Sequence, residues 1–502
     1  MKRSLASGAL VFVVLVLPTV AAAAAHAALR ADRPLFTLDL GAPSFGGGAV
    51  ADLDGDGRPE VLVGTYYHDE RVLALRSDGT LLWQRPSGGG PVDDSVTVAD
   101  LDGDGVPEVL WGNSGSTVFH VADATGHDRW TKTIGEVLDA PAAVADMDGD
   151  GRLDIVLASC GSAAGGGLRA FAGDTGRELW HAERGGCYQS APLLLDQDGN
   201  GRLDVVVSTW FDNKVRAFSG QDGTLRWETT IGGWTYHAGA FGDLNGDGVP
   251  DVALGDYSGT LWALDGRSGA VLWSEKLEGV TYVFGPTAMG DLDGDGATEV
   301  VVAADNVQVF DAHGRRRLKL ALPGYGTRGP ALADVDDDGH PDIVVASDGP
   351  ALTAFAGTDG RVLFSHSFPD HAAFDFQPTV ADLDGDGVLD VFGVFGRGQS
   401  DTPEQNWGRA VALRLGGHGP GWVTYSHDLH HSGNYGYLGG TTLIGTRTPW
   451  ATAPTGTPKA TATTAPRTAS PSRTPTATSQ PVPTRTSEDS DGSRCYLPSA
   501  TR

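Results

Sequence analysis

Cysteine, basic residues and long apolar runs are scarce in this sequence, and each scarcity excludes a class of protein. Three cysteines in 502 residues, with no CxxC motif, exclude a disulfide scaffold, a zinc ribbon, a thioredoxin-type redox site and an attached c-type haem. Lys and Arg number 36 against 64 Asp and Glu, and the net charge of -28 repels phosphate backbones, so nucleic acid is not an expected partner. Beyond the N-terminus, no stretch has the 18 or more apolar residues of a transmembrane helix.

Glycine is abundant, and it indicates a chain that turns often. There are 72 glycines in 502 residues, without a collagen period. Hydrophobic residues make up 40% of the chain, enough for a sizeable core. Many short strands joined by tight turns would account for both features.

The two ends of the chain predict an exported protein. Residues 1–27 combine Lys2 and Arg3, an apolar run over 9–17 and the small residues around Ala27, as a secretory signal peptide does. Residues 441–502 are rich in Thr and Pro, with little to bury, and predict a disordered tail. We expect the protein to be secreted, extracellular or at the cell surface. The tail is mildly basic and could contact an anionic envelope polymer.

An acidic motif recurs eight times between these ends. It reads Asp-x-Asp/Asn-x-Asp/Asn-Gly-x-x-Asp/Glu followed by an apolar run, and its copies start 43 to 50 residues apart. This period is that of a four-stranded propeller blade. The first residues of the copies are Asp52, Asp100, Asp146, Asp196, Asp243, Asp291, Asp334 and Asp382.

Two further patterns favour an all-β, eight-bladed β-propeller over residues 35–440, with seven blades as the alternative. A turn Gly is followed four residues later by a large apolar residue in most repeats, as in Gly79/Trp83 and Gly176/Trp180, which predicts structural tryptophans packed between blades. Residues 35–40 precede the first acidic loop where a fourth strand would stand. We expect this strand to complete the last blade and close the ring.

The acidic loops have the ligand pattern of calcium sites. Alternating carboxylates on a Gly-bearing loop, one backbone carbonyl and a final carboxylate supply hard oxygen ligands, which suit calcium better than magnesium or zinc. We expect up to eight calcium ions, with weaker binding where an Asn replaces an Asp. The predicted ligands, the fourth of each set through its carbonyl, are Asp52, Asp54, Asp56, Arg58 and Glu60; Asp100, Asp102, Asp104, Val106 and Glu108; Asp146, Asp148, Asp150, Arg152 and Asp154; Asp196, Asp198, Asn200, Arg202 and Asp204; Asp243, Asn245, Asp247, Val249 and Asp251; Asp291, Asp293, Asp295, Ala297 and Glu299; Asp334, Asp336, Asp338, His340 and Asp342; and Asp382, Asp384, Asp386, Val388 and Asp390.

These repeats resemble the FG-GAP (VCBS) repeats of integrin α-chain propellers over roughly residues 35 to 440. The Phe-Gly and Gly-Ala-Pro halves of that motif are mostly degenerate here, with Phe284-Gly285-Pro286 the nearest approach, so integrin-like adhesion is not implied. The stretches 170–180 and 263–273 also resemble the tryptophan-docking motif of quinoprotein dehydrogenases, whose fold is an eight-bladed propeller. That family places a disulfide between adjacent cysteines against its quinone, and this chain has no adjacent cysteines.

A ligand-binding face is expected opposite the acidic loops. If each acidic loop joins the first and second strands of a blade, the loops after strands two and four meet on the other face, and they are rich in aromatic residues. A site for an extracellular glycan or protein is the first hypothesis, ahead of a polysaccharide lyase resembling the rhamnogalacturonan-lyase propellers and of a quinoprotein-type oxidoreductase. We assign no catalytic residue. The predicted ligand residues are Tyr188, Trp210, Trp234, Tyr236 and His237.

Two other features carry expectations. Cys160 follows the second strand of the third blade and Cys187 precedes the first strand of the fourth, so they should lie on the same face and form a disulfide. Cys495 is then left alone on the tail. The segment Trp422-x-x-Tyr-x-His427-Asp428 resembles the closing segment of bacterial secreted propellers. We interpret it as a structural cap rather than a catalytic site.

Overall fold

A computed structural model describes residues 34–66, 69–93, 95–161, 166–349, 351–368, 373–398, 402–422, 426–428 and 431. The chain divides into two compact units, Met1–Arg447 and Thr448–Arg502, and the described residues belong to the first. The predicted signal peptide, the predicted tail and Cys495 lie outside the described residues. No helix in the described part of the chain is long and apolar enough to cross a membrane.

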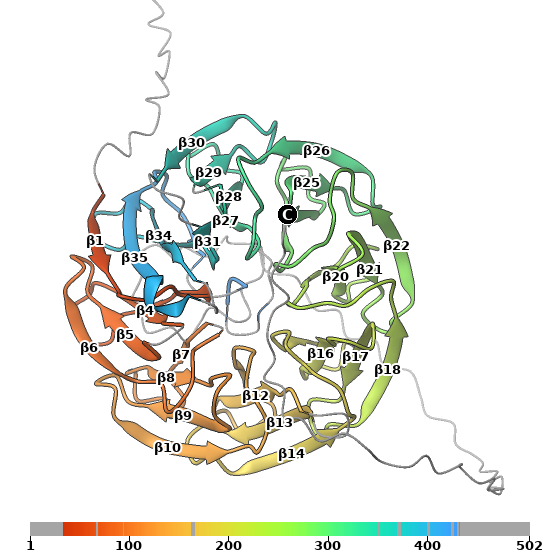
Figure 1. Ribbon diagram of the computed structural model, residues 1–502. Coiled ribbons are helices and arrows are strands. Elements are labelled where there is room, and N and C mark those ends of the chain that lie inside the picture. The colour runs from red at the N-terminus through yellow and green to blue at the C-terminus, as the bar shows by residue number, and fades with distance from the viewer. Residues whose placement is uncertain are drawn as a thin grey trace, which may run out of the picture. The chain divides into compact units, whose positions relative to one another are not determined.

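The described chain is almost entirely β-structure, arranged as eight sheets around a ring (Figure 1). Seven blades each consist of four consecutive antiparallel strands. Blade 1 contains β3 (Ala49–Ala51), β4 (Glu60–Gly64), β5 (Arg71–Leu75) and β6 (Leu81–Pro86); blade 2 contains β7 (Thr97–Ala99), β8 (Glu108–Trp111), β9 (Val118–Ala122) and β10 (Asp128–Thr133); blade 3 contains β11 (Ala143–Ala145), β12 (Asp154–Ala158), β13 (Gly167–Ala172) and β14 (Glu178–Glu183); blade 4 contains β15 (Leu193–Leu195), β16 (Asp204–Ser208), β17 (Lys214–Phe218) and β18 (Leu225–Thr230). Blade 5 contains β19 (Ala240–Gly242), β20 (Asp251–Gly255), β21 (Thr260–Leu264) and β22 (Val271–Lys276); blade 6 contains β23 (Ala288–Gly290), β24 (Glu299–Ala303), β25 (Asn306–Phe310) and β26 (Arg316–Ala321); blade 7 contains β27 (Ala331–Ala333), β28 (Asp342–Ser347), β29 (Ala351–Phe355) and β30 (Val362–Ser367).

Blade 8 is built from both ends of the propeller. It contains β33 (Thr379–Ala381), β34 (Asp390–Arg397) and β35 (Trp407–Arg414), and its outermost strand is β1 (Phe36–Asp39), which pairs antiparallel with β35. Figure 1 shows red β1 beside blue β35. The short β31 (Ala373–Phe374) also pairs with β34, and β2 (Gly46–Gly47) pairs in parallel with β32 (Phe376–Gln377). A single turn of 3-10 helix, η1 (Pro403–Gln405), precedes β35. The predicted eight blades and the closing N-terminal strand are confirmed.

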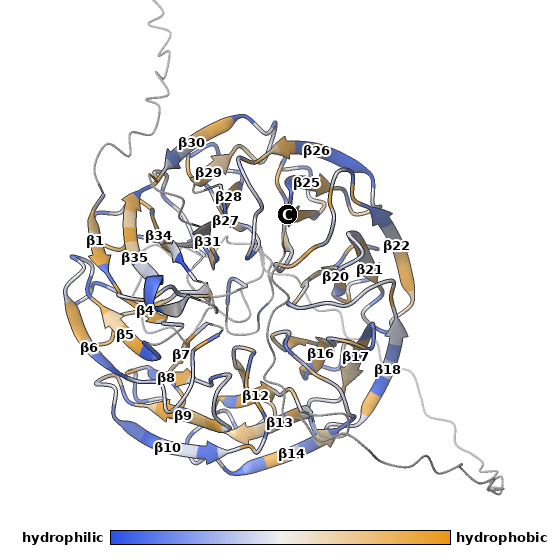
Figure 2. Cartoon of the chain, in the orientation of Figure 1, coloured by the Kyte–Doolittle hydropathy of each residue, from blue (hydrophilic) through white to orange (hydrophobic). Residues whose placement is uncertain are grey.

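Burial divides each blade into inner and outer strands. The inner strands are short and wholly buried, as in β11 and β15, because both of their faces pack on neighbouring blades. The outermost strands alternate exposed and partly buried residues, as in β10 and β26. Figure 2 accordingly shows hydrophilic residues gathering on outer strands such as β10. The first strands of successive blades lie side by side around the centre of the ring, and β33 of blade 8 lies beside β3 of blade 1.

Tryptophans on the fourth strands of blades 1 to 5 join each of these blades to the next, as predicted. Trp180 Nε1 on β14 donates to the carbonyl of Gly220, 2.6 Å away in the turn before β18 of blade 4. Its ring lies against the next turn glycine, where a Cβ on Gly223 would be 2.8 Å from Trp180 Cε3. Four more tryptophans donate in the same way: Trp83 to Ala124, Trp130 to Gly173, Trp227 to Gly266 and Trp273 to Ala312. The partner of each tryptophan is therefore the turn of the following blade.

This contact predicts a stability difference between two glycine substitutions. Gly269 has a φ of +70°, and a Cβ there would be 2.5 Å from the Trp227 ring. Gly135 has a φ of +86° with nothing within 4 Å of a Cβ, so it provides the matched control. We expect Gly135→Ala to cost about 1 kcal/mol from backbone strain alone, and Gly269→Ala to cost about 1–3 kcal/mol more from overpacking. Denaturant unfolding measures the stability of the two variants, and equal losses would contradict a close contact between Gly269 and the Trp227 ring.

Candidate functional site

The eight acidic loops lie together on one face of the propeller, because each joins the first strand of a blade to the second. In the first loop, Asp52 Oδ1 accepts from Gly55 N at 2.8 Å and Asp52 Oδ2 accepts from Gly57 N at 2.9 Å. Gly57 has a φ of +86°, which a side chain would resist. Asp56 Oδ1 accepts from Arg58 N at 2.8 Å. The side chains thus organise their own loop into a tight turn.

The same turn is built eight times. In every loop the amide of the glycine five residues after the first Asp donates to that Asp at 2.8 to 3.0 Å. In every loop the residue after that glycine donates to the third acidic or amide side chain at 2.8 to 3.0 Å. The predicted ligand positions therefore share one geometry around the ring.

The last carboxylate of each loop is buried at the start of the second strand. Glu60 is 1% exposed and accepts from Leu53 N at 2.8 Å. Burial, aided by the charges of Asp54 and Asp52, raises the pKa of Glu60 to about 7. Burial likewise raises the pKa of the other seven final carboxylates: Glu108, Asp154, Asp204, Asp251, Glu299, Asp342 and Asp390. Each loop thus holds acidic groups that a cation would stabilise.

The donor atoms are close enough to hold a metal ion. Oxygens of Asp52, Asp54 and Glu60 lie within 4.8 Å of one another. Comparable groups form from Asp100, Asp102 and Glu108; Asp146, Asp148 and Asp154; Asp291, Asp293 and Asp295; and Asp334, Asp336 and Asp342. Asp204 Oδ2, Asp336 Oδ1 and Asp390 Oδ1 are buried without a hydrogen-bond partner. A set of carboxylate oxygens with such orphaned atoms fits a hard cation.

Arginines partly neutralise the loops from the same blade. In seven loops an Arg faces the second acidic residue, and in blade 5, where that residue is Asn245, Arg267 faces Asp247 instead. The seven pairs are Arg76–Asp54, Arg129–Asp102, Arg177–Asp148, Arg226–Asp198, Arg317–Asp293, Arg361–Asp336 and Arg414–Asp384. Asn245 Nδ2 donates to Asp251 Oδ1 and Asp265 Oδ2, at 3.3 Å each. The amide thus acts as an internal donor where the other loops have a carboxylate.

The opposite face carries an aromatic patch, which consists of Trp210, Phe211, Trp234, Tyr236 and Tyr257. The ring of Trp210 lies at its centre, with centroid distances of 4.8 to 5.4 Å to the other four rings. Phe211 and Trp234 are 58% and 41% exposed, whereas Trp210 and Tyr236 are 7% and 6% exposed. Phe211 also has a φ of +79°, which is rare for a bulky residue. Two exposed rings therefore stand on a buried aromatic base.

The five predicted ligand residues do not share one environment. Trp210, Trp234 and Tyr236 belong to the aromatic patch, and of the five only Trp234 is exposed. Tyr188 is fully buried among residues of blades 3 and 4, and its hydroxyl accepts from Arg216 Nη1 at 2.8 Å. His237 is buried and stacks edge-on against Tyr236 at 4.6 Å. Phe211, which the sequence-based ligand set lacks, is the more exposed ring.

Apart from His237, sequence reasoning missed a polar group of side chains at the start of the first strands, on the same side as the aromatic patch. This central cluster consists of Asp93, Asp139, Gln189, His237, Arg328 and Asp375. Four of them occupy the same position in the repeat, seven residues before the first Asp of an acidic loop: Asp93, Asp139, Gln189 and Asp375. The eight residues at this position are Phe45, Asp93, Asp139, Gln189, Tyr236, Phe284, Thr327 and Asp375.

Arg328 links much of the central cluster. It is 1% exposed; its Nε donates to Asp375 Oδ1 and its Nη1 to His237 Nε2, both at 2.7 Å. The guanidinium also lies 5.0 Å from the Phe284 ring and 5.6 Å from the Phe45 ring. Burial and the charge of Arg328 lower the pKa of His237 well below its usual value, so the ring is neutral and accepts. One arginine thus contacts side chains from blades 1, 5, 6 and 8.

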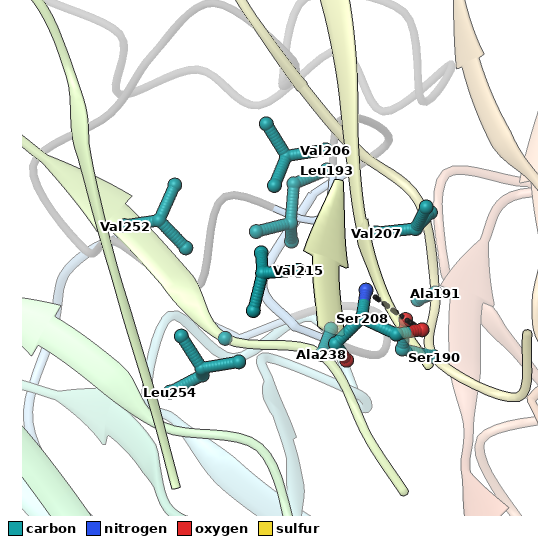
Figure 3. Close-up of a pocket in the computed structure, with 11 residues that line it drawn as sticks. Ser190, Ala191, Leu193, Val206, Val207, Ser208, Val215, Ala238, Val252 and Leu254 are labelled. Atoms are coloured by element: carbon teal, nitrogen blue, oxygen red, sulfur yellow. Dashed lines mark hydrogen bonds between the residues drawn. The ribbon is translucent and has the colours of Figure 1, made fainter. Parts of the chain in front are cut away.

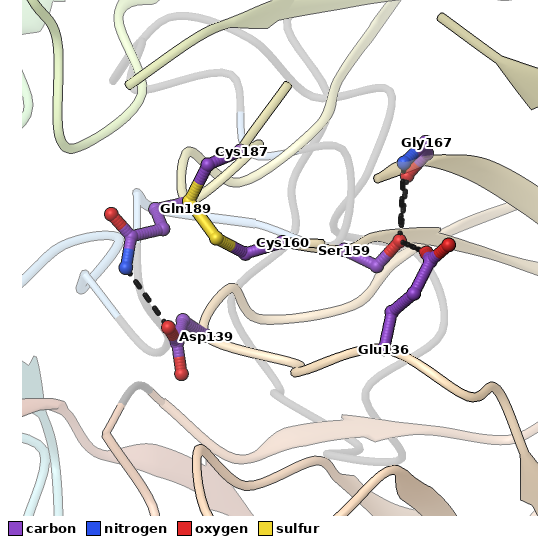
Figure 4. The surroundings of a disulfide bond; sticks show 7 residues. All are labelled: Glu136, Asp139, Ser159, Cys160, Gly167, Cys187 and Gln189. Carbon is purple, nitrogen blue, oxygen red and sulfur yellow. Dashed lines mark hydrogen bonds between the residues drawn. A yellow bond between two sulfur atoms is a disulfide. The ribbon is translucent and has the colours of Figure 1, made fainter. Parts of the chain in front are cut away.

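The predicted disulfide between Cys160 and Cys187 is confirmed, and it lies between the aromatic patch and the central cluster. Trp210 N donates to the carbonyl of Cys187 at 2.9 Å, and both cysteines pack in one apolar group with Trp210 and Tyr236. On its other side, Gln189 Nε2 donates to Asp139 Oδ2 at 2.9 Å (Figure 4). The disulfide therefore fixes the aromatic base relative to Asp139.

The closing segment contacts opposite sides of the ring. Trp422 is fully buried and exchanges two backbone hydrogen bonds with Val380 on β33 of blade 8. Ser426 N donates to Gln377 Oε1 at 3.0 Å, also in blade 8, and His431 Nδ1 lies 3.1 Å from the carbonyl of Pro192 in blade 4. His427 and Asp428 pair with each other at 3.1 Å and are buried. These contacts are those of a structural cap.

A small void between blades 4 and 5 offers little to a ligand. It is lined by aliphatic residues such as Leu193, Val206 and Val252 (Figure 3). Ser190 and Ser208, which also line it, are hydrogen-bonded to each other at 3.0 Å. The void is best described as imperfect packing between two blades.

Comparisons with known proteins agree with this architecture. Solved structures share the propeller fold at low identity: the biofilm matrix protein Bap1 of V. cholerae (TM-score 0.61, 15% identity, 77% of this chain and 91% of that one), Sqt1 of Saccharomyces cerevisiae (0.57, 12%, 76% and 99%) and a quinohemoprotein alcohol dehydrogenase of Comamonas testosteroni (0.55, 10%, 77% and 77%). These likenesses show the fold alone. No curated protein is significantly similar in sequence.

The family model described as the FG-GAP-like repeat matches residues 52–111, 196–254, 243–302, 291–345 and 334–393. Each matched segment contains at least one of the acidic loops described above. Together the segments cover just over half of the chain, and the chain therefore belongs to the family of FG-GAP-like repeat proteins.

Proposed function

We propose that the protein is an extracellular calcium-binding β-propeller that binds a glycan or protein ligand through the face opposite its acidic loops. The observation that carries this proposal is the division between the two faces. One face repeats a single carboxylate-rich turn eight times, whereas the other presents two exposed aromatic rings on a rigid base. A repeated oxygen-ligand turn suits a structural ion, and an exposed aromatic pair suits a ligand.

Calcium fits the acidic loops better than other common cations. The donors are carboxylates at positions one, three, five and nine with one backbone carbonyl between them, as in Asp52, Asp54, Asp56, Arg58 and Glu60. Calcium accepts six to eight such oxygens, while magnesium keeps more of its water and zinc prefers His or Cys. A bound ion would compensate for the burial of the final carboxylate.

The strain at Phe211 supports a ligand role for the aromatic patch. A bulky residue at φ +79° costs roughly 1–3 kcal/mol and is kept where the surroundings enforce it. In this conformation the Phe211 ring lies edge-on to Trp234, at a centroid distance of 5.4 Å, and both rings are accessible. Exposed aromatic rings on rigid loops are typical anchors of binding energy.

An extracellular location is supported by two findings. Disulfides such as Cys160–Cys187 persist in oxidising compartments. A propeller of similar fold, Bap1, is a biofilm matrix protein. We do not favour the lyase hypothesis, because an acidic polysaccharide would meet the carboxylates of Asp93, Asp139 and Asp375 on this face.

Removing calcium should destabilise the propeller strongly. Each ion at about 100 times its Kd contributes about 2.7 kcal/mol by mass action, and the freed carboxylates would repel one another. We expect excess chelator to lower the Tm by at least about 10 °C, and calcium to restore it at lower concentration than magnesium. Calorimetry measures the Tm with and without chelator, and an unchanged Tm in chelator would contradict the calcium assignment.

The two loops with an amide offer a matched pair of variants. We expect Asn245→Asp and Asn200→Asp each to lower the calcium concentration needed for half-maximal stabilisation, because each adds a carboxylate. In metal-free protein Asn245→Asp should lose more stability than Asn200→Asp, by about 1 kcal/mol, since the Asn245 amide donates to two carboxylates, Asp251 and Asp265, whereas the Asn200 side chain bonds to one carboxylate, Asp198, and accepts from Arg202 N. Urea unfolding in chelator separates the two, and no gain in calcium response would argue against the loops as sites.

The ligand face can be tested with the two exposed rings. We expect Phe211→Ala/Trp234→Ala to lose at least tenfold in affinity for a glycan identified on an array of immobilised polysaccharides, with little change in Tm. Val271→Ala/Leu272→Ala is the control, because these residues are 45% and 36% exposed on the outer strand β22. Equal binding by both double variants would place the site elsewhere.

A further inference from the structure

The central cluster has more negative charge than its own cation balances. Its carboxylates are Asp93, Asp139 and Asp375, and Arg328 is ion-paired with Asp375. Burial, together with the charge of Asp139, raises the pKa of Asp93 to about 8, and burial raises the pKa of Asp139 to about 6. Asp93 and Asp139, in neighbouring blades, thus form a pair of acidic groups that a bound cation would stabilise.

Two buried oxygens, one in this pair and one beside it, have no hydrogen-bond donor. Asp139 Oδ1 and Gln189 Oε1 lack a hydrogen-bond partner, although the two residues are only 2% and 4% exposed. A buried polar atom without a partner costs free energy that a donor from a ligand would recover. Figure 4 shows the Gln189 carbonyl oxygen turned away from the disulfide, while its amide nitrogen holds Asp139. A group with several N–H donors and a positive charge meets both needs, as an ammonium ion does.

The aromatic patch is continuous with these acceptors. Trp210 packs on the disulfide that precedes Gln189 in the chain, and it contacts Trp234 and Phe211 on its outer side. Tyr236 connects the same base to His237 of the central cluster, at a centroid distance of 4.6 Å. Packed side chains therefore link the exposed rings to the carboxylates of the centre.

The exposed apolar area on this face favours a sugar over a protein. Among the described residues, Phe211 and Trp234 are the only exposed large hydrophobic side chains on it. The others are Leu81, Val271, Leu272 and Val362 on outermost strands and Val106 in an acidic loop. A stable protein interface buries about 800 Å² on each partner, which two rings do not supply. Two rings do match the flat faces of one or two sugar units.

From these observations we infer that the ligand is a glycan bearing primary ammonium groups, such as a polymer of glucosamine. Its sugar rings stack on Phe211 and Trp234, and an ammonium group is received by Asp93 and Asp139 with the carbonyl oxygen of Gln189. The inference rests on the proposed ligand face and adds the chemical class of what binds there.

Matched oligosaccharides test this directly. The probes are hexamers of β-1,4-linked glucosamine and of N-acetylglucosamine, which differ in charge at the amine, together with hexalysine and an oligogalacturonate. Titration calorimetry is run with full-length protein in excess calcium, so that the acidic loops are saturated. We expect the glucosamine hexamer to bind at least tenfold more tightly than each of the other three probes.

Isosteric variants locate the contact. We expect Asp139→Asn and Asp93→Asn each to weaken binding of the glucosamine hexamer at least tenfold, with Tm and calcium content near those of the wild type. The side chain introduced by Asp139→Asn can still accept from Gln189, so the fold should persist. If that variant does not fold, Asp93→Asn provides the test. Glu178→Gln, which removes one charge from the outer strand β14, should bind as the wild type does.

Each of the other outcomes overturns a stated part of the inference. Equal affinity for the two hexamers would remove ammonium recognition but leave a glycan-binding face. Hexalysine binding as tightly as the glucosamine hexamer would show that sugar rings are not required, and a peptide would become the ligand. Binding of oligogalacturonate alone, or of no probe, would refute the inference, while the test of Phe211 and Trp234 on the glycan array would still decide the proposed function.

Discussion

The antiparallel pairing of β1 with β35 is the constraint on which the rest of the structure depends. It places the start of the described chain in the same sheet as the last strands of the propeller, so the eight blades form a closed ring without a free edge between blades 8 and 1. Closure gives every blade two neighbours, and the tryptophan contacts of the fourth strands then act between successive blades. It also fixes the first strands around one centre. Residues at equal register in the repeats consequently meet at the same level of the ring.

Two opposite faces follow from that register. The residue that begins each acidic loop directly follows a first strand, and the residue seven positions earlier precedes the same strand, so the strand separates the acidic loop from the central cluster. The acidic face gathers like charges, which favours a cation in each loop. On the other face the charges are fewer, and the disulfide and Arg328 hold them in place. Ions bound in the acidic loops would therefore stabilise the ring without touching the aromatic patch.

The sequence predicted what each repeat encodes by itself. The acidic loops, the blade count, the closing strand and the Cys160–Cys187 pair all followed from spacing within one period or from position in a blade. It could not predict contacts that depend on the curvature of the ring. Arg328 meets His237 from two blades earlier, and this distance in sequence carries no periodic signal. Nor could spacing show that Trp210 and Tyr236 form the buried base of the patch while Phe211 is exposed, because that depends on which rings stack.

The repeats also separate what the fold requires from what it leaves open. Where the turn needs it, all eight copies agree: each acidic loop begins with Asp, and its fifth following residue is Gly at positive φ. Seven positions before that Asp the copies diverge into carboxylates in blades 2, 3 and 8, an amide in blade 4 and aromatic rings in blades 1, 5 and 6. The backbone of the propeller does not explain this divergence, since the same position serves the same strand in every blade. Buried carboxylates are costly to a fold that could do without them, and a ligand that needs acidic groups beside aromatic rings would account for their presence.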